Sequence, residues 1–146
     1  MIMKMENKPT VVDLFAGAGG LSVGFKDAGF KIIAANEIVK VFGETYLLNH
    51  PDTKLFTGDI RNITVDEFKK ECNINGKKVD VVVGGPPCQG FSMAGSRDPK
   101  DPRNSLFKEF VRFIEGLKPK FFVMENVKGI LSAKTVNKES VKEIIM

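Results

Sequence analysis

Short apolar runs alternate with longer stretches of helical spacing along this chain. The runs lie at Thr10–Phe15, Phe30–Asn36, Lys54–Thr57, Val79–Val83 and Phe121–Met124. Runs this short, rich in valine, isoleucine and phenylalanine, are typical of strands buried on both faces. Helical spacing predicts helices over Leu21–Ala28, Val39–Asn49, Thr64 to about Cys72 and Ser105–Leu117, and the start of an amphipathic helix near Val141. Strands that alternate with helices predict an α/β fold with a doubly wound, mostly parallel sheet.

The stretch Ser105–Leu117 gives the clearest helical signal. Its apolar positions fall on one face: Leu106, Phe110, Phe113, Ile114 and Leu117. A single apolar stripe indicates core packing, so we expect these phenylalanines to pack inside the protein and not to stack on bases. Thr64 and Glu67 form the pattern of a capping box, which predicts that a helix begins there.

A glycine-rich turn, Ala16–Gly20, follows the first predicted strand directly. Strand, glycine turn and helix together indicate a nucleotide-binding sheet, because the turn lets a ligand approach the backbone near a helix N-terminus. The dinucleotide fingerprint does not fit, since Ser22 occupies its third glycine position. Glu37, about 20 residues beyond the first glycine, is placed to accept hydrogen bonds from ribose hydroxyls. The alternative for Glu37 is an acidic residue at a helix N-terminus.

Two further acidic residues stand at the carboxyl ends of predicted strands. Asp59 follows the third strand and Glu125 follows the fifth. Parallel strands place their carboxyl ends at one edge of the sheet, where ligands bind in open α/β folds. We therefore expect Asp59 to face the same crevice as Glu37, and a plain turn aspartate is the alternative.

The fourth predicted strand runs into a stiff corner that carries a cysteine. Two glycines end the strand, Pro86 and Pro87 fix two φ angles, and Cys88 follows them. A thiol at this edge is a candidate nucleophile, provided that its site favours the thiolate or offers a base. Glu125, at the next strand tip, is placed to protonate a ring nitrogen while the thiolate attacks. The alternative is a structural corner in which the cysteine has no chemical role.

Composition narrows the class of protein. A length of 146 residues is typical of a single domain. The fractions of hydrophobic residues, 42%, and of charged residues, 27%, are ordinary for a globular domain. No apolar run reaches membrane-spanning length and the amino terminus lacks a signal-peptide core, so we expect a cytoplasmic protein without a membrane partner. The net charge of +4 and the pI of about 9.1 are compatible with a nucleic-acid partner but do not establish one.

Two cysteines and one histidine offer little for a metal site. Cys72 and Cys88 show no CxxC or histidine-rich spacing, so we expect neither a structural metal nor a disulfide framework. Cys72 lies in a charged helical stretch and is interpreted as structural. His50, beside Pro51, is interpreted as a helix-end residue and not as a catalyst.

The segment Arg97–Arg103 is too rich in proline and charge to be regular, and together with Gly90–Ser96 it is predicted to form a long mobile loop directly after Cys88. Long loops at a catalytic edge are often lids or binding loops. The alternative is that this segment is a solvent-exposed loop that only connects two elements.

Five segments of the chain resemble, in order, the amino-terminal motifs of the cytosine carbon-5 DNA methyltransferases. They are Asp13–Gly20, Asn36–Glu37, Gly58–Ile60, Gly85–Ser92 and Glu125–Val127. The match extends from Val11 to about Gly129, and the run Pro-Pro-Cys-Gln-Gly-Phe-Ser is its most specific part. The resemblance implies the Rossmann-like fold of S-adenosylmethionine-dependent methyltransferases, with S-adenosylmethionine as the cofactor and no metal.

The resemblance implies a role for each motif of the cofactor site. Phe15 would pack on the adenine and Glu37 would bind the ribose. Asp59 and Ile60 would hold the adenine edge, and the glycine turn would face the methionine part. The implied cofactor contacts are Phe15, Ala16, Gly17, Gly19, Gly20, Glu37, Ile38, Asp59, Ile60 and Pro86.

The resemblance also implies the chemistry at the corner. Cys88 would attack carbon 6 of a cytosine flipped out of duplex DNA, and Glu125 would bond ring nitrogen 3. Carbon 5 would then take the methyl group, and loss of its proton would release Cys88. Pro87 would shape the floor of the pocket. DNA contacts are implied for Gln89, Ser92, Arg97 and Arg103, of which the arginines suit phosphate.

The family has further motifs beyond Glu125–Val127 that this sequence does not contain. We therefore expect residues 1–146 to be the amino-terminal part of the catalytic domain, without the target-recognition domain and the carboxyl-terminal motifs, and to be inactive alone. The sheet would lack its last two strands and be incomplete at that edge, so Phe121–Met124 would be an exposed apolar strand prone to self-association. The implied partners are duplex DNA and a cognate restriction endonuclease of the same system.

Two other interpretations stay open. A transfer-RNA cytosine-5 methyltransferase shares these motifs, and Gly90-Phe91-Ser92 favours the DNA branch only modestly. A non-catalytic nucleotide-binding module, one half of a two-chain assembly, would use the corner as architecture. Binding of NAD without binding of S-adenosylmethionine would support that module.

Overall fold

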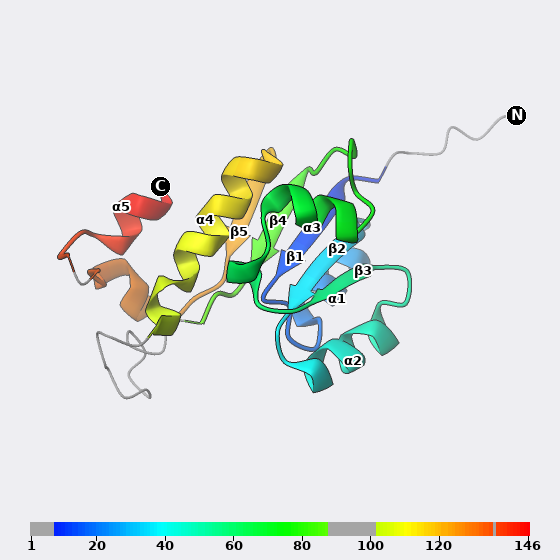
Figure 1. Ribbon diagram of the computed structural model, residues 1–146, viewed down its shortest axis with the longest axis horizontal. Coiled ribbons are helices and arrows are strands. Elements are labelled where there is room, and N and C mark those ends of the chain that lie inside the picture. The colour runs from blue at the N-terminus through cyan, green and yellow to red at the C-terminus, as the bar shows by residue number, and fades with distance from the viewer. Residues whose placement is uncertain (1–7, 88–101, 136) are drawn as a thin grey trace, which may run out of the picture.

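The computed structural model describes residues 8–87, 102–135 and 137–146. Over these residues, one parallel sheet of five strands has the order β3-β2-β1-β4-β5 and carries helices on both faces (Figure 1). The strands are β1 Thr10–Leu14, β2 Lys31–Glu37, β3 Lys54–Thr57, β4 Val81–Gly84 and β5 Phe121–Met124. The helices are α1 Gly20–Asp27, α2 Lys40–Asn49, α3 Val65–Glu71, α4 Leu106–Leu117 and α5 Val141–Ile145, with 3₁₀ turns η1 Ile60–Asn62, η2 Pro102–Ser105 and η3 Lys128–Ser132. The predicted α/β fold with its doubly wound parallel sheet is confirmed.

Alternate residues of β1 pack into two separate cores, one on each face of the sheet. Val12 lies in the cluster under α3 and α4, where the rings of Phe68 and Phe113 meet edge to face at 5.2 Å. Val11 lies on the opposite face, packed against Phe25 of α1. Four of the five residues of the predicted apolar stripe of α4 are buried, namely Leu106, Phe110, Phe113 and Leu117, and Ile114 is partly buried. The central strand is therefore fixed from both sides, as expected for a strand enclosed between two helical layers.

The strand order reverses next to β1, which pairs with β2 on one side and with β4 on the other. In open α/β sheets, ligands bind outside the carboxyl ends of the strands at such a reversal. Leu14 and Gly84 are partners there, and a methyl group added at Gly84 would meet the carbonyl oxygen of Leu14. Only glycine lets the tips of β1 and β4 approach this closely.

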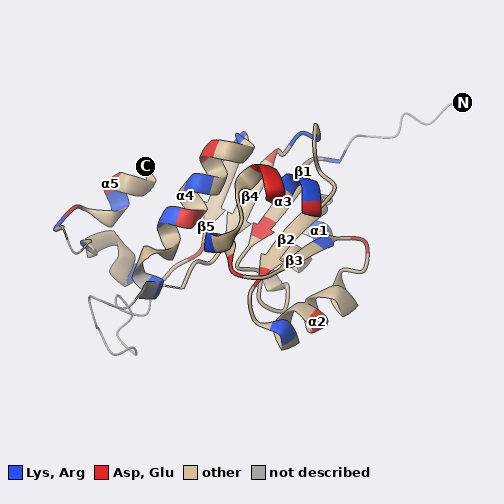
Figure 2. Cartoon of the chain, viewed as in Figure 1, with Lys and Arg blue, Asp and Glu red and all other residues tan. Residues whose placement is uncertain are grey.

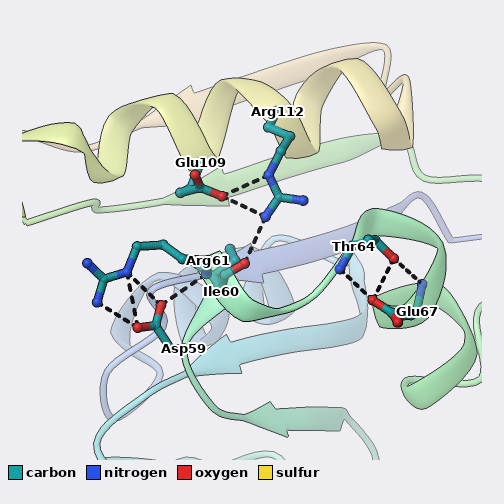
Figure 3. Close-up of polar contacts among 7 residues, drawn as sticks. All are labelled: Asp59, Ile60, Arg61, Thr64, Glu67, Glu109 and Arg112. Atoms are coloured by element: carbon teal, nitrogen blue, oxygen red, sulfur yellow. Dashed lines mark hydrogen bonds and ion pairs between the residues drawn. The ribbon is translucent and has the colours of Figure 1, made fainter.

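The predicted bounds of three strands are wrong, and β2 is Lys31–Glu37 and not Phe30–Asn36. β1 ends at Leu14 because Phe15 has a φ of 58°, which lies in the left-handed region. The fourth strand is Val81–Gly84 and not Val79–Val83, because Gly84 remains paired with both neighbouring strands. The predicted helix start at the capping box is confirmed, since Thr64 and Glu67 each bond the backbone of the other (Figure 3).

The strand β5 exposes its apolar side chains. Phe121 is 70% exposed, and Phe122 and Val123 are also exposed. The prediction of a buried strand, made from its composition, is therefore wrong for the described chain. The exposed edge that the family resemblance implied is confirmed, since β5 pairs only with β4 among the strands that the structure describes.

Charges of both signs alternate along α3 and α4, whereas α2 carries few (Figure 2). Within the described ranges, no helix has the length and apolar character to cross a membrane, and no group of three or more histidine, cysteine, aspartate or glutamate side chains could hold a metal ion. Cys72 is buried at the end of α3, and burial raises the pKa of its thiol to about 12. This environment confirms the structural interpretation of Cys72.

Candidate functional site

A cavity of about 570 Å³ opens at the carboxyl ends of the strands, beside η1. Its lining comprises Phe15, Gly17, Asn36, Glu37, Ile38, Val39, Phe42, Asp59, Ile60, Arg61, Gly85, Pro87, Arg103 and Leu106. The predicted cofactor residues Phe15, Gly17, Glu37, Ile38, Asp59 and Ile60 are brought together here. Four others do not line the cavity: Ala16, Gly19, Gly20 and Pro86. The volume is in the range of small-molecule binding sites.

Residues predicted for the reaction and for DNA are only partly described. Pro87 and Arg103 line the same cavity as the predicted cofactor residues. Cys88, Gln89, Ser92 and Arg97 lie outside the described residues.

Glu37 joins the glycine turn to the start of α2. Its Oε2 accepts a hydrogen bond from the backbone N–H of Gly17, and its Oε1 accepts one from the N–H of Val39, both at 2.7 Å. The bond from Val39, the N-cap of α2, agrees with the alternative interpretation of Glu37 as an acidic residue at a helix N-terminus. Each carboxylate oxygen has a second lone pair, so hydrogen bonds from ribose hydroxyls can be added without breaking them. The ribose role stays a prediction.

Asp59 caps η1 and pairs with Arg61 (Figure 3). The guanidinium of Arg61 bonds both carboxylate oxygens at 2.6 to 3.0 Å, and the backbone N–H of Arg61 bonds Oδ1 at 3.0 Å. The side-chain bonds from Arg61 hold the pKa of Asp59 below its usual value. Asp59 is thus a turn aspartate, in agreement with the alternative interpretation, and it also lines the cavity. An adenine contact stays a prediction.

The tips of β4 and β5 are joined by two hydrogen bonds. The N–H of Glu125 donates to the carbonyl of Gly84 at 3.0 Å, and Nδ2 of Asn126 donates to the carbonyl of Pro86 at 2.9 Å. A methyl group at Gly85 would lie 3.2 Å from Oε2 of Glu125, so this carboxyl group lies against the backbone of the corner. The predicted acid is therefore held beside the segment that leads to the predicted nucleophile.

Six cavity residues were not among the predicted site residues: Asn36, Val39, Phe42, Arg61, Gly85 and Leu106. Phe42 is 48% exposed and adds an apolar wall from α2. Asn36 bonds the carbonyls of Phe56 and Gly58 and thereby joins the ends of β2 and β3. Arg61 orients Asp59, and the spacing of an aspartate followed two residues later by an arginine was the available signal.

The glycine turn packs against two aromatic rings, those of Tyr46 in α2 and of His50 directly after this helix. Gly19 has a φ of 97°, and a Cβ at this position would lie 2.6 Å from Nε2 of His50 and 3.0 Å from Tyr46. The two rings pack with their centroids 4.7 Å apart. His50 is the C-cap of α2, which confirms its interpretation as a helix-end residue. The turn has this path only because position 19 has no side chain.

A buried polar chain that sequence reasoning also missed begins on β1. Oδ2 of Asp13 accepts from the hydroxyl of Ser22 at 2.7 Å, and that hydroxyl lies 2.8 Å from the hydroxyl of Tyr46. Within the described chain, Oδ1 of Asp13 has no hydrogen-bond partner. Burial raises the pKa of Asp13 to about 6, the bonds from Ser22 oppose this rise, and the charge of Glu37 adds to it. In the sequence, an aspartate inside an apolar strand was the feature that could have indicated this buried polar chain.

Replacing Asp13 by asparagine is expected to raise the free energy of unfolding at pH 7 by about 3 kcal/mol. The folded chain holds the Asp13 proton more tightly than the unfolded chain, in which this pKa is near 3.8. The stability that this group contributes is therefore complete below the unfolded pKa and is lost as the pH rises through about 6. Asparagine avoids this loss, so the gain should disappear below about pH 4. Urea unfolding of both proteins at both pH values measures the difference, and a less stable variant at pH 7 would contradict it.

Comparisons with known proteins agree with one another. A family model described as C-5 cytosine-specific DNA methylase matches residues 9–146. The chain is 52% identical over 135 residues to the Type II methyltransferase M.DdeI of Desulfomicrobium norvegicum, covering 92% of this chain and 32% of that protein. It is 49% identical to the Type II methyltransferase M.FnuDI of Fusobacterium nucleatum, covering 92% of this chain and 36% of that protein.

Among solved structures, the chain resembles a prophage-encoded E. coli protein described as a DNA modification methyltransferase. The TM-score is 0.78 at 34% sequence identity, and the match covers 94% of this chain and 36% of that chain. The chain thus spans about a third of the length of these relatives.

Proposed function

The chain belongs to the C-5 cytosine-specific DNA methylase family, and from this premise we propose that it forms the cofactor-binding and catalytic part of an enzyme that methylates carbon 5 of cytosine in DNA. The proposal is supported by the position of predicted cofactor residues and of the proline corner at one edge of the sheet. Pro87 lines the same cavity as Glu37 and Asp59, while the adjoining corner holds Glu125 through the bond from Asn126 to Pro86. A methyl donor and a target base would therefore meet at the tips of β1 and β4.

The cavity residues fit the parts of S-adenosylmethionine. Phe15, Ile38 and Phe42 offer apolar surface for the adenine, and Glu37 offers acceptors for the ribose hydroxyls. Asp59 offers an acceptor for an exocyclic amino group. When bound, the cofactor supplies an activated methyl group on a positively charged sulfur.

The chain's own residues would then act on the base. The Cys88 thiolate adds to carbon 6 of a flipped cytosine, and the displaced electron pair moves toward ring nitrogen 3, where Glu125 gives a hydrogen bond. Carbon 5 becomes nucleophilic and would take the methyl group that the cofactor supplies, while the electron pair of the broken carbon–sulfur bond stays on the sulfur, which becomes neutral. A base such as water would then take the proton from carbon 5, and the freed electron pair restores the ring double bond as the Cys88 thiolate leaves. Extrusion of the base costs a few kcal/mol, which contacts in the pocket must recover.

Duplex DNA is the proposed substrate, and transfer RNA is the less favoured one. The matching family model is described as a DNA methylase, and the relatives named above are Type II methyltransferases. Methyl transfer is therefore expected to duplex DNA and not to transfer RNA, measured with radiolabelled S-adenosylmethionine on a protein of the relatives' length that contains this chain. Transfer to RNA alone would refute the DNA assignment.

Several finer expectations belong to the same proposal. We expect the 146-residue chain to transfer no methyl group alone, since it spans about a third of its relatives. A cognate restriction endonuclease and self-association through β5 are also expected. Sedimentation of the chain as a monomer at all concentrations would contradict the self-association.

A further inference from the structure

Asp13 is a buried carboxylate on the strand that leads to the candidate cofactor site. It is fully buried on β1, two residues before Phe15, which lines the cavity. Ser22 lies in the first turn of α1, a helix whose N-cap Gly19 provides no side-chain hydrogen bond. Asp13 therefore supplies a negative charge close to the positive end of this helix, where a carboxylate is favoured.

The polar chain connects Asp13 to the glycine turn. The hydroxyl of Ser22 bonds Asp13 and lies within hydrogen-bond distance of Tyr46. The ring of Tyr46 lies so close to Gly19 that a Cβ there would be 3.0 Å away. A displacement of Asp13 would thus be transmitted through Ser22 and Tyr46 to the turn.

The neighbouring side chains that the structure describes do not provide a positive charge that would stabilise the buried carboxylate of Asp13. The groups that face it are Ser22 from α1, Tyr46 from α2 and the like-charged Glu37 from β2, while His50 packs on Tyr46. None of the described interactions of Asp13 involves a lysine or an arginine. A buried charge without a cationic partner lowers stability, and such groups are concentrated at functional sites.

We propose that Asp13 is a positioning residue of the cofactor site: it fixes the glycine turn through Ser22 and Tyr46, and its charge favours a ligand with positive charge on the other side of the turn. The inference rests on the proposed function, in which that ligand is S-adenosylmethionine with its sulfonium sulfur. The positive ligand is the cationic partner that Asp13 lacks among the described residues.

The first test needs no ligand and uses the 146-residue chain. The carboxyl carbon of Asp13 and the backbone amides of Gly19 and Gly20 are followed by NMR between pH 4 and 8. We expect the two amide signals to shift with the same midpoint as Asp13, and this inflection to be absent in Asp13→Asn. Amide signals that do not follow Asp13 would overturn the positioning role.

The second test separates charge from structure. Calorimetry compares S-adenosylmethionine with S-adenosylhomocysteine, whose sulfur is neutral. Asparagine keeps an oxygen that can accept the hydrogen bond from Ser22, so Asp13→Asn removes the charge but keeps the link to the turn. It is expected to weaken S-adenosylmethionine binding about tenfold at pH 7.5 and to leave S-adenosylhomocysteine binding nearly unchanged. Tyr46→Phe keeps the ring against Gly19 but removes the hydroxyl, so it should weaken both ligands equally, by about threefold.

The outcomes distinguish the inference from the proposed function. Equal binding of S-adenosylmethionine by Asp13→Asn and the unchanged chain would overturn the charge role. An unchanged chain that binds neither ligand would contradict the proposed function and the charge role together. In that case the NMR titration still decides whether Asp13 positions the turn.

Discussion

Exchange of Cys88 for serine is expected to abolish covalent capture of DNA that carries a mechanism-based cytosine analogue, and to slow methyl transfer at least about 1000-fold. A serine hydroxyl at this position would remain protonated near neutral pH, so it cannot add to carbon 6 as a thiolate does. Capture is measured on a denaturing gel with a protein of the relatives' length that contains this chain.

The other cysteine provides the matched control for this experiment. Cys72 is buried, and burial raises the pKa of its thiol to about 12, so it is not a nucleophile. Cys72→Ala should retain covalent capture at a temperature where the variant is folded. Capture by Cys88→Ser would exclude Cys88 as the nucleophile, whatever the control shows.

Alanine at Gly19 is expected to lower the free energy of unfolding by about 3 kcal/mol and to abolish cofactor binding. The new Cβ would lie 2.6 Å from Nε2 of His50, and the backbone would have to keep a φ of 97° that alanine rarely adopts. Relief of this clash must move either the turn or His50, which is buried. Urea unfolding and a binding titration measure both effects.

Gly24 provides a control within the same helix. A Cβ at Gly24 would meet no atom within 4 Å, and this residue lies in the interior of α1. Gly24→Ala should therefore raise stability by up to about 1 kcal/mol through helix propensity and leave cofactor binding unchanged. A Gly19→Ala variant that behaves like Gly24→Ala would show that the turn is not confined by His50.

Local patterns predicted the elements well because each pattern reflects a local cause. The stripe of α4 and the capping box at Thr64 depend on residues three or four positions apart, so the sequence contains the whole signal. The exposure of β5 depends instead on what lies beside it, and its own apolar residues indicated burial.

The site was predictable in its acidic residues but not in how they are bonded. Glu37 and Asp59 do line one cavity, yet the partners that hold them, Val39 and Arg61, follow from turn geometry. The polar chain of Asp13 joins β1, α1 and α2, so no single stretch of sequence reveals it. Contacts between residues this far apart in the sequence can be recognised only in the folded structure.

Calorimetric titration of the 146-residue chain with S-adenosylmethionine and with NAD tests the central assignment most directly. We predict that S-adenosylmethionine binds, that NAD does not, and that Glu37→Gln weakens binding about tenfold because one carboxylate acceptor is lost. Binding of NAD without binding of S-adenosylmethionine would contradict a methyltransferase site at this edge of the sheet.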